Sequence, residues 1–425
     1  MLSLVGLALA FALALGLSAQ AHGAGDRGPG GERSAGRSDD AVHLISDAAG
    51  TRSYWTAARM RDAAPLALRL SREPAGRGTT SPDGGVPGYI APADPGSEPA
   101  AKLRRGGFAD PSARAVSPGD ERDFPNRVHG RVFATYPEQG DFTCSATVVN
   151  APGRSLVLSA GHCVYSAGAW ATNWMFVPGY RDGNAPFGRW VATELRATEQ
   201  WKASEALSFD IGTATLGRDA TGRGIQDAVG ARGIGFNQPR NQTYMSYGYP
   251  AEPPFDGESL QSCTSPYGGD DTSSAPPRTM RIDCDMNGGS SGGGWVAGDL
   301  VLSLNSYCNG LILICTDLPM SLFGPYFGDD AETLYRASRG RAAKCAGSTV
   351  TQLGGAGAQS FTGSGGRDTI SLGAGADSAA GRSGRDTLCG GKGRDVLRGG
   401  PGRDVCIGGP GKDKARGCEV RLQIP

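Results

Sequence analysis

Short alternations of apolar and polar residues dominate the middle of the chain. Between Asn126 and Ala343, runs such as RVFATY, CSATVV, SLVLSA and DLVLSLNSY are rich in β-branched and aromatic residues, and Gly, Pro, Asn and Asp separate them. Strands bounded by such turn residues are typical of an all-β fold. About 220 residues of this texture predict a two-barrel or large sandwich domain. The run ETLYRASRGRAA near its end predicts a closing helix.

The chain begins with a different pattern. Residues 2–17 are almost wholly apolar, and Ala19 and Ala21 after them form a small-x-small cleavage motif. This predicts a secretory signal peptide over residues 1–21, although no basic residue precedes the apolar run. The alternative, a membrane anchor, needs about 20 apolar residues and usually basic flanks. We therefore expect no membrane span in the mature protein.

Residues 22–125 lack a sustained apolar period. Residues 22–40 are polar and glycine-rich, which favours disorder. Thr56 is placed to cap a short helix over AARMRDA that ends before Pro65. Beyond Ser71, proline, glycine and charge dominate, so we expect a long disordered tether. A short helix and a tether between a signal peptide and a domain predict a pro-segment, with a simple spacer as the alternative.

From Gly354 the chain repeats every nine residues, in the pattern G-G-x-G-x-D-x-U-x with an apolar residue at U. So strict an interval predicts a repeat domain, which we place at residues 346–425, after a barrel domain at 126–345. The aspartates that recur at this interval are Asp368, Asp377, Asp386, Asp395, Asp404 and Asp413.

Net charge and cysteine content limit which classes of binding partner and which cellular compartment we expect. Lys and Arg total 42 and Asp and Glu total 42, so the formal net charge is zero and points to neither nucleic acid nor an anionic membrane. All ten cysteines lie after residue 140, and no C-x-x-C pair occurs among them. An even number without metal spacing is typical of disulfides in an exported protein rather than of zinc. We expect a secreted, extracellular protein that binds no nucleic acid.

One glycine-rich stretch, NGGSSGGGW, raises the possibility of a serine nucleophile. Such a nucleophile needs a base, a group that orients the base, and backbone N–H groups for the oxyanion. Of the four histidines, His162 in LSAGHCV is the candidate base, and Asp210 in SFDIGTATL lies between apolar residues on a predicted strand. A buried carboxylate there would need a polar partner such as an imidazole. A Gly/Ser run by itself is more often a linker.

The motifs LVLSAGHCV, FDIGTATL and GGSSGGGW, in that order, resemble the trypsin/chymotrypsin-like serine proteases. The likeness is strongest to the secreted bacterial branch that includes the glutamyl endopeptidases. It covers about residues 126–343 and implies two six-stranded antiparallel β-barrels with the active site between them. It also implies that His162 is the general base, Asp210 its orienter and Ser291 the nucleophile. No cofactor is implied for catalysis.

The same resemblance assigns the surroundings of the nucleophile. The amides of Gly289 and Ser291 would form the oxyanion hole, and Ser290, which fits a looser G-x-S-x-G, is the rival nucleophile. Many animal trypsins carry an aspartate at the position of Ser290, and it receives the new N-terminus on activation. Because a serine cannot form that ion pair, we expect activation by removal of a masking pro-segment.

Substrate specificity is less defined. Asp285 lies six residues before Ser291, where trypsins carry the aspartate that binds Arg or Lys. Asn305 corresponds roughly to the glutamate-selecting histidine of the glutamyl endopeptidases, and no histidine follows His162. Glutamate preference by that route is not expected, and the residue preferred before the cleaved bond stays open.

Three disulfides are expected. Cys144 with Cys163 would join the strands that carry His162, as in the family. Our next pairings are Cys263 with Cys284, before the nucleophile, and Cys308 with Cys315, across a short hairpin. The sequence leaves the pairing of the other four cysteines open; they are Cys345, Cys389, Cys406 and Cys418.

The nonapeptide resembles the calcium-binding β-roll repeats of the RTX type. The resemblance implies a parallel β-roll in which the repeated aspartates and backbone carbonyls bind Ca²⁺, while each U residue points inward. Gln359 replaces aspartate in the first repeat, which would then be a cap. Arginine or lysine precedes most of the aspartates, as in Arg367 and Arg385. These cations could weaken calcium binding, or pair with the aspartates in a calcium-free roll.

Together these features predict a secreted serine endopeptidase, made as a precursor, that acts on protein or peptide substrates as a monomer. The alternative is a catalytically silent protease homologue that serves as a surface-binding or adhesion module. The complete set of His162, Asp210 and Ser291 argues against that alternative.

Overall fold

The computed structural model describes most of the chain after residue 41. The described residues are 42–45, 47–66, 85–93, 114–220, 222–308, 321–340, 344–354 and 357–424. The predicted signal peptide and Cys315 lie outside them. Among the described helices, none is long and apolar enough to cross a membrane.

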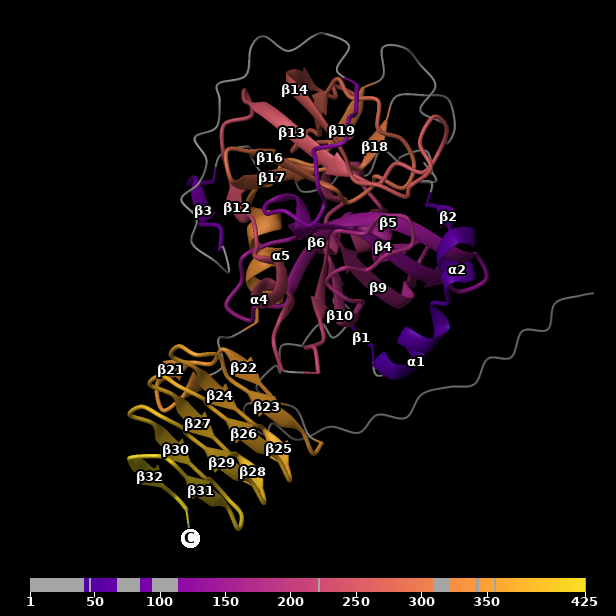
Figure 1. Cartoon of the computed structure of the whole chain (residues 1–425). Coiled ribbons are helices and arrows are strands. Elements are labelled where there is room, and N and C mark those ends of the chain that lie inside the picture. The colour runs from indigo at the N-terminus through magenta and orange to yellow at the C-terminus, as the bar shows by residue number, and fades with distance from the viewer. Residues whose placement is uncertain are drawn as a thin grey trace, which may run out of the picture. The chain divides into compact units, whose positions relative to one another are not determined.

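Six antiparallel strands close the first barrel (Figure 1). They pair in the order β10, β11, β6, β5, β4 and β9, and β9 pairs back with β10. Their bounds are Trp190–Ala197, Gly212–Leu216, Leu156–Ser159, Gly140–Val148, His129–Tyr136 and Thr172–Pro178, respectively. Trp174 and Phe176, which share one face of β9, are fully buried inside. The apolar pattern of these runs is therefore explained by a closed barrel.

The second protease sheet is barrel-like and contains nine strands, in the order β18, β19, β15, β14, β13, β16, β17, β12 and β3. Their bounds are Tyr307–Cys308, Leu322–Gly324, Met280–Ile282, Gln261–Asp270, Thr243–Gly248, Gly294–Ala297, Leu300–Leu304, Gly233–Phe236 and Gly88–Ile90. Tyr244, Ile282 and Trp295 are buried in its core. The predicted closing helix is present as α5, Asp329–Ser338, which begins slightly earlier than the sequence pattern indicated.

Short elements connect the strands of both sheets. They are the helices α3 (Glu199–Ser204) and α4 (Ile225–Val229), the 3₁₀ turns Asn126–Val128, Gly161–Cys163 and Leu207–Phe209, and the hairpin strands β7 (Tyr165–Ser166) and β8 (Ala169–Trp170). Two of the 3₁₀ turns carry the candidate base and its candidate orienter.

The region before the barrels packs against the first barrel. Helix α2, Ala57–Asp62, begins at Thr56 as predicted, and the Thr56 side chain accepts from the Arg59 amide. Between α1 (Ala48–Tyr54) and α2, Trp55 is 1% exposed and its Nε1 donates to the Asn173 carbonyl. Strand β1, Val42–Leu44, pairs with β10, and β2, Ala64–Pro65, runs parallel to β5. Residues 42–66 are thus part of the barrel's packing.

The tether expected beyond Ser71 is partly ordered, which corrects that expectation. Strand β3 pairs antiparallel with β12. Val116 exchanges backbone hydrogen bonds with Ser262, and Glu121 is 2% exposed and accepts from Arg181 at 2.9 Å. Sheet edges and buried partners distant in sequence order these pieces, and no local periodicity reveals such partners.

The repeat domain is a parallel β-roll of two facing sheets. One contains β22, β24, β27, β30 and β32, and the other contains β23, β26, β29 and β31. Their bounds are Gln352–Leu353, Thr369–Ser371, Thr387–Cys389, Val405–Ile407 and Val420–Leu422 for the first, and Ser360–Thr362, Ser378–Ala380, Val396–Arg398 and Lys414–Arg416 for the second. Small paired strands accompany them: β20 (Lys344–Cys345) with β21 (Ser348–Thr349), and β25 (Ala374–Gly375) with β28 (Lys392–Gly393).

Each coil of the roll is two nonapeptides long. Ile370 pairs in register with Leu388, and Leu388 with Cys406, so equivalent residues stand 18 apart. These three U residues are fully buried, and so is Leu397 of the facing sheet. The parallel roll and the inward direction of these U residues are therefore as the repeat predicted.

Candidate active site and repeat aspartates

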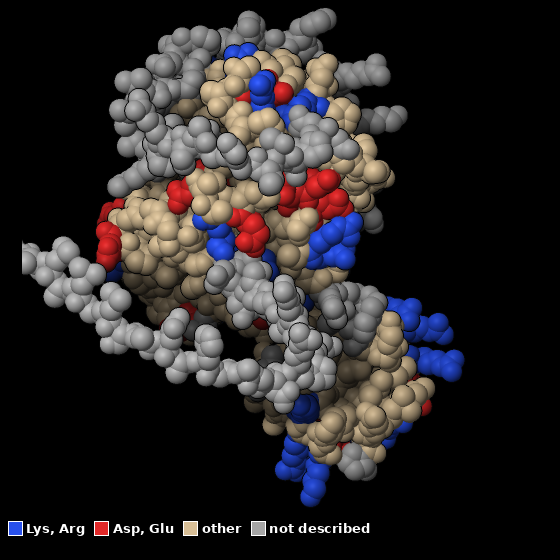
Figure 2. Space-filling model, turned by 180° about the vertical axis from the view of Figure 1, so that it is seen from behind, with Lys and Arg blue, Asp and Glu red and all other residues tan. Residues whose placement is uncertain are grey.

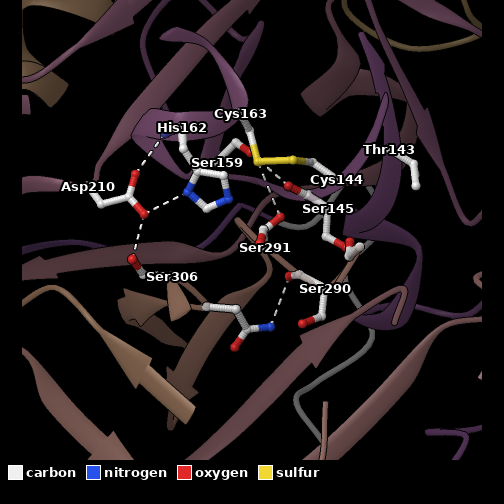
Figure 3. The surroundings of a disulfide bond; sticks show 12 residues. Thr143, Cys144, Ser145, Ser159, His162, Cys163, Asp210, Ser290, Ser291 and Ser306 are labelled. Carbon is white, nitrogen blue, oxygen red and sulfur yellow. Dashed lines mark hydrogen bonds and ion pairs between the residues drawn. A yellow bond between two sulfur atoms is a disulfide. The ribbon is translucent and has the colours of Figure 1, made fainter. Parts of the chain in front are cut away.

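His162 and Asp210 meet in the first barrel, at the ends of two neighbouring strands (Figure 3). His162 lies on the 3₁₀ turn after β6, and Asp210 directly follows the 3₁₀ turn Leu207–Phe209, two residues before β11 begins. The His162 Nδ1 is 2.8 Å from Asp210 Oδ2, while the His162 amide donates to Asp210 Oδ1 at 2.7 Å. Both side chains are fully buried. The carboxylate therefore fixes both the backbone and the ring of His162.

A further residue, Ser306, holds the carboxylate from the other sheet. Its hydroxyl donates to Asp210 Oδ2, the oxygen that faces the imidazole. Buried carboxylates are costly unless hydrogen-bonded, and Ser306 supplies one of the donors that Asp210 needs. Sequence reasoning missed Ser306, because LNSYC carries no local signal of this contact beyond its place next to Asn305.

The two serines of the glycine run have different environments. The Ser290 hydroxyl donates to the Asn287 carbonyl at 2.7 Å, and Ser290 is 2% exposed. The Ser291 hydroxyl has no hydrogen-bond partner within the described ranges, and Ser291 lies beside the His162 ring in Figure 3. Its carbonyl oxygen accepts from the Ser145 amide at 2.7 Å. Of the pair, Ser291 is the serine left available to react.

Glycines let the backbone of this run turn its amides outward. Gly289 has a φ of +91°, and a Cβ there would lie 2.7 Å from the Tyr249 carbonyl oxygen, so a larger residue would be strained. The amides of Gly289 and Ser291 find no acceptor in the part of the chain that the structure describes, whereas those of Ser290 and Gly292 do. Two free donors beside an unbonded serine are what an oxyanion hole requires.

Aspartates link the successive coils of the roll. The backbone N–H of each of four aspartates donates to Oδ1 of the aspartate one coil later, and each bond is 2.9 Å long. The donor-acceptor pairs are Asp368–Asp386, Asp377–Asp395, Asp386–Asp404 and Asp395–Asp413. Gln359 begins the series by donating to Asp377, and Glu419 ends it by accepting from the Asp404 amide.

The second oxygen of most of these carboxylates is buried without a hydrogen-bond partner. This holds for Oδ2 of Asp377, Asp386, Asp395, Asp404 and Asp413. The Asp395 Oδ2 lies 2.6 Å from where a Gly390 Cβ would stand, and the Gly408 carbonyl oxygen is equally close to that point. Burial, with the neighbouring aspartates adding to it, raises the pKa of Asp386 and Asp395. Orphaned carboxylate oxygens beside carbonyl oxygens fit a hard cation such as Ca²⁺.

Two solved structures are similar to the barrel part of the chain. One is the protease Anisep from Arthrobacter nicotinovorans, 36% identical over 50% of this chain and 95% of that chain, with a TM-score of 0.46. The other is the thermostable serine protease AL20 from an extremophilic microorganism, 38% identical over 50% of this chain and 97% of that chain, with a TM-score of 0.46. The chain belongs to the trypsin/chymotrypsin-like serine proteases.

Other comparisons concern the barrel part and the repeat part of the chain. A Glu endopeptidase structure is 19% identical over 53% of this chain and 96% of that chain, with a TM-score of 0.42. The model of the RTX calcium-binding nonapeptide repeat matches residues 353–388 and 380–415. No sequence among curated proteins matches the chain.

Disulfides brace the protease and the roll separately. Cys144–Cys163 and Cys263–Cys284 are present as predicted. Cys308 is disulfide-bonded, and its predicted partner Cys315 lies outside the described residues. The roll contains Cys345–Cys389 and Cys406–Cys418, the pairings that the sequence left open. Since Cys144 and Cys163 are joined, the cluster that they form with His162 is not a metal site.

Both candidate specificity residues have hydrogen-bond partners within the chain. Asp285 accepts from the Ala115 amide through Oδ1. Asn305 is 1% exposed; its amide nitrogen donates to the carbonyls of Tyr247 and Ser290, each at 3.0 Å. Asn305 therefore braces the turn that carries the candidate nucleophile, and its side-chain amide has no donor left for a substrate.

The cations of the repeats do not replace calcium by pairing with the aspartates. The Arg or Lys before each of five aspartates is exposed, as in Arg385 and Arg403, while the aspartates themselves are buried. Within the described coils, no ion pair joins a repeat cation to a repeat aspartate. The orphaned carboxylate oxygens thus stay available for a metal ion.

Proposed function

We propose that the chain is the precursor of a secreted serine endopeptidase that hydrolyses peptide bonds in protein or peptide substrates. The observation that carries this proposal is the unbonded Ser291 hydroxyl, next to free amides and beside a His162–Asp210 pair. The sequence identity to the two protease structures also supports this proposal. The roll and the disulfides support an extracellular site of action, where disulfides persist.

The proposed chemistry follows from the positions of these groups. His162 Nε2 takes the proton of the Ser291 hydroxyl as its oxygen attacks the substrate carbonyl, and Asp210 stabilises the imidazolium that forms. The N–H groups of Gly289 and Ser291 donate to the oxyanion. His162 then returns the proton to the leaving amine, which releases the first product. A water molecule cleaves the acyl-enzyme by the same proton transfers.

We propose further that residues 42–66 belong to a masking pro-segment. The Leu66 amide donates to the Thr143 carbonyl at 3.1 Å, one residue before Cys144. Pro65 lies next to Gly288, with its Cβ 3.2 Å from the position of a Gly288 Cβ. The pro-segment thus runs beside the candidate oxyanion hole. Fully buried His162, whose Nε2 has no hydrogen-bond partner among the described residues, is consistent with a covered site.

Calcium is proposed for the roll and not for catalysis. The oxygens that would hold it are Oδ2 of the repeat aspartates and carbonyl oxygens of the glycine turns. In the described coils no three carboxylates come within 4.8 Å of one another, so each ion would depend mainly on carbonyls and few carboxylates. When bound, the ion supplies positive charge that offsets the burial of these carboxylates and stabilises the coils.

Fluorophosphonate labelling of the processed protein tests the proposal. The wild type and Ser290→Ala should be labelled and should cleave a mixed peptide library, while Ser291→Ala should do neither. The Ser290→Ala variant is the matched control, because it alters the same turn without touching the proposed nucleophile. An unlabelled, correctly folded wild type would instead favour the silent binding module.

A further inference from the structure

Nearly all charged side chains exposed on the roll are cationic. Residues 354–425 contain eleven Lys and Arg and seven Asp and Glu. All six repeat aspartates are buried, so Glu419 is the one exposed acidic residue among the described coils. Figure 2 shows Lys and Arg projecting from this domain with little acid between them. The exposed cations are Arg367, Arg382, Arg385, Lys392, Arg394, Arg398, Arg403, Lys412, Lys414, Arg416 and Arg421.

These cations form rows along the roll. Arg398 pairs in register with Arg416 on neighbouring strands. Arg367, Arg385 and Arg403 stand two residues before strands that align coil upon coil. Neighbouring parallel strands lie about 4.8 Å apart, so each row repeats a positive charge at about that interval.

Such rows of like charge destabilise the folded roll. Like charges directly opposite each other in a sheet are destabilising. No carboxylate within the described part of the roll forms an ion pair with these side chains. Glu419, which interacts electrostatically with Arg403, is the one exposed carboxylate of the described roll and cannot offset both rows. This excess of exposed positive charge indicates an anionic partner outside the chain.

Calcium would strengthen this field; here the inference rests on the calcium binding proposed above. Eleven cations against seven carboxylates leave a formal charge of +4, and neutralising the six buried aspartates would leave +10. Binding would also order the coils that hold the rows in register. An anionic partner should then bind the calcium-loaded roll more tightly than the calcium-free roll.

We infer that the roll is a calcium-dependent binding surface for a linear acidic polysaccharide. Straight rows with a regular interval, comparable to the length of one sugar unit, suit an extended polymer with one charge per unit. Proteins that bind single-stranded nucleic acid stack bases on exposed aromatics. The one aromatic residue of the roll, Phe361, is 1% exposed. Among its large apolar side chains only Leu422 is strongly exposed, so no apolar patch favours membrane insertion.

The test uses the full chain carrying Ser291→Ala and fluorescent heparin as the probe, with neutral dextran and a charge-matched oligothymidylate as comparison ligands. In millimolar calcium we expect heparin to bind, and chelation to weaken binding at least tenfold. Arg385→Glu with Arg403→Glu should weaken it about tenfold or more, and binding should fall steeply with salt. The matched control, Arg61→Glu with Arg278→Glu, makes the same charge change outside the roll and should stay within about twofold.

A second variant distinguishes weaker binding caused by lost charge from weaker binding caused by misfolding. Arg398→Thr with Arg416→Thr removes a row from the strand face and adopts the residue that Thr362 already provides in the same register. Equal loss in the control variant, equal affinity for the oligothymidylate, or calcium-independent binding would each overturn the inference. The melting temperature of the roll with and without calcium separates the two proposals. A calcium shift without heparin binding overturns the surface alone, while no calcium shift overturns the calcium proposal.

Discussion

The barrels and the roll bury different kinds of side chain. The first barrel encloses aromatic residues such as Trp174 and Phe176, which gain stability simply by leaving water. The roll encloses a column of buried carboxylates together with a narrow row of apolar side chains that includes Ile370 and Leu388. Burying apolar groups stabilises a fold unaided, whereas burying carboxylates requires a counter-charge. The barrels are therefore stable by themselves, whereas the roll is expected to be stabilised by calcium from the surrounding solution.

The largest expected effect tests whether peptide hydrolysis is independent of the calcium-dependent stability of the roll. Asp210→Asn keeps the shape of the side chain that holds His162 but removes its charge, and should lower kcat about 10⁴-fold. The calcium-dependent melting of the roll should not change. Peptide hydrolysis and differential scanning calorimetry on one preparation measure both. Lost calcium dependence in this variant would mean that the two parts are coupled after all.

Next in size is the aromatic anchor of the N-terminal segment. Trp55→Ala should cost about 3–5 kcal/mol in the unfolding of the precursor, since a fully buried indole is lost. The cost should be equal with and without calcium. Urea unfolding of the Ser291→Ala precursor gives the value, and Arg52→Ala, at an exposed site on the preceding helix α1, is the control. A cost that appeared only in calcium would contradict the distinction between the two parts.

A smaller effect is expected within the roll. Asp395→Asn keeps the oxygen that accepts from the Asp377 amide but removes the charge. Without calcium the melting temperature should stay the same or rise. With calcium the variant should lose the stabilisation from that site, about 2.7 kcal/mol at a hundredfold excess over Kd. Lys392→Ala, an exposed change in the same repeat, should keep it. Equal calcium stabilisation in Asp395→Asn would rule out this carboxylate as a ligand.

The smallest effect concerns pH. The folded roll raises the pKa of Asp386 and Asp395 above the ordinary value of 3.8. Their contribution to stability is therefore full below 3.8 and is lost as the pH rises through the raised pKa. In chelator, the roll should melt at a higher temperature near pH 4 than near pH 7. Calcium should reverse the trend, because protons compete with the ion. The barrel transition serves as the internal reference.

Sequence reasoning succeeded where a repeating or ordered motif carries the information. The nine-residue period identifies the coils, because each coil places the same residue at the same point. The three motifs around His162, Asp210 and Ser291 similarly imply the barrels, and the structure brings those residues together. The catalytic roles themselves remain predictions that labelling and kinetics can test.

What the sequence could not supply depends on contacts between distant segments. Ser306 contacts Asp210 across 96 positions, and Trp55 reaches Asn173 across 118. The pairing of β3 with β12 is equally non-local. The disulfide Cys345–Cys389 joins residues 44 apart, a distance that follows from the stacking of coils rather than from local spacing. Each of these contacts exists only once the sheets have formed.

The file of aspartate hydrogen bonds also has a direction. Each coil's amide is satisfied by the coil that follows it, and Glu419, near the end of the chain, closes the series. If the chain crosses a membrane with its N-terminus first, each emerged coil lacks the acceptor for its aspartate amide until the next coil has followed it. The order of the bonds would thus make the completion of each coil wait for the arrival of the next coil outside the cell.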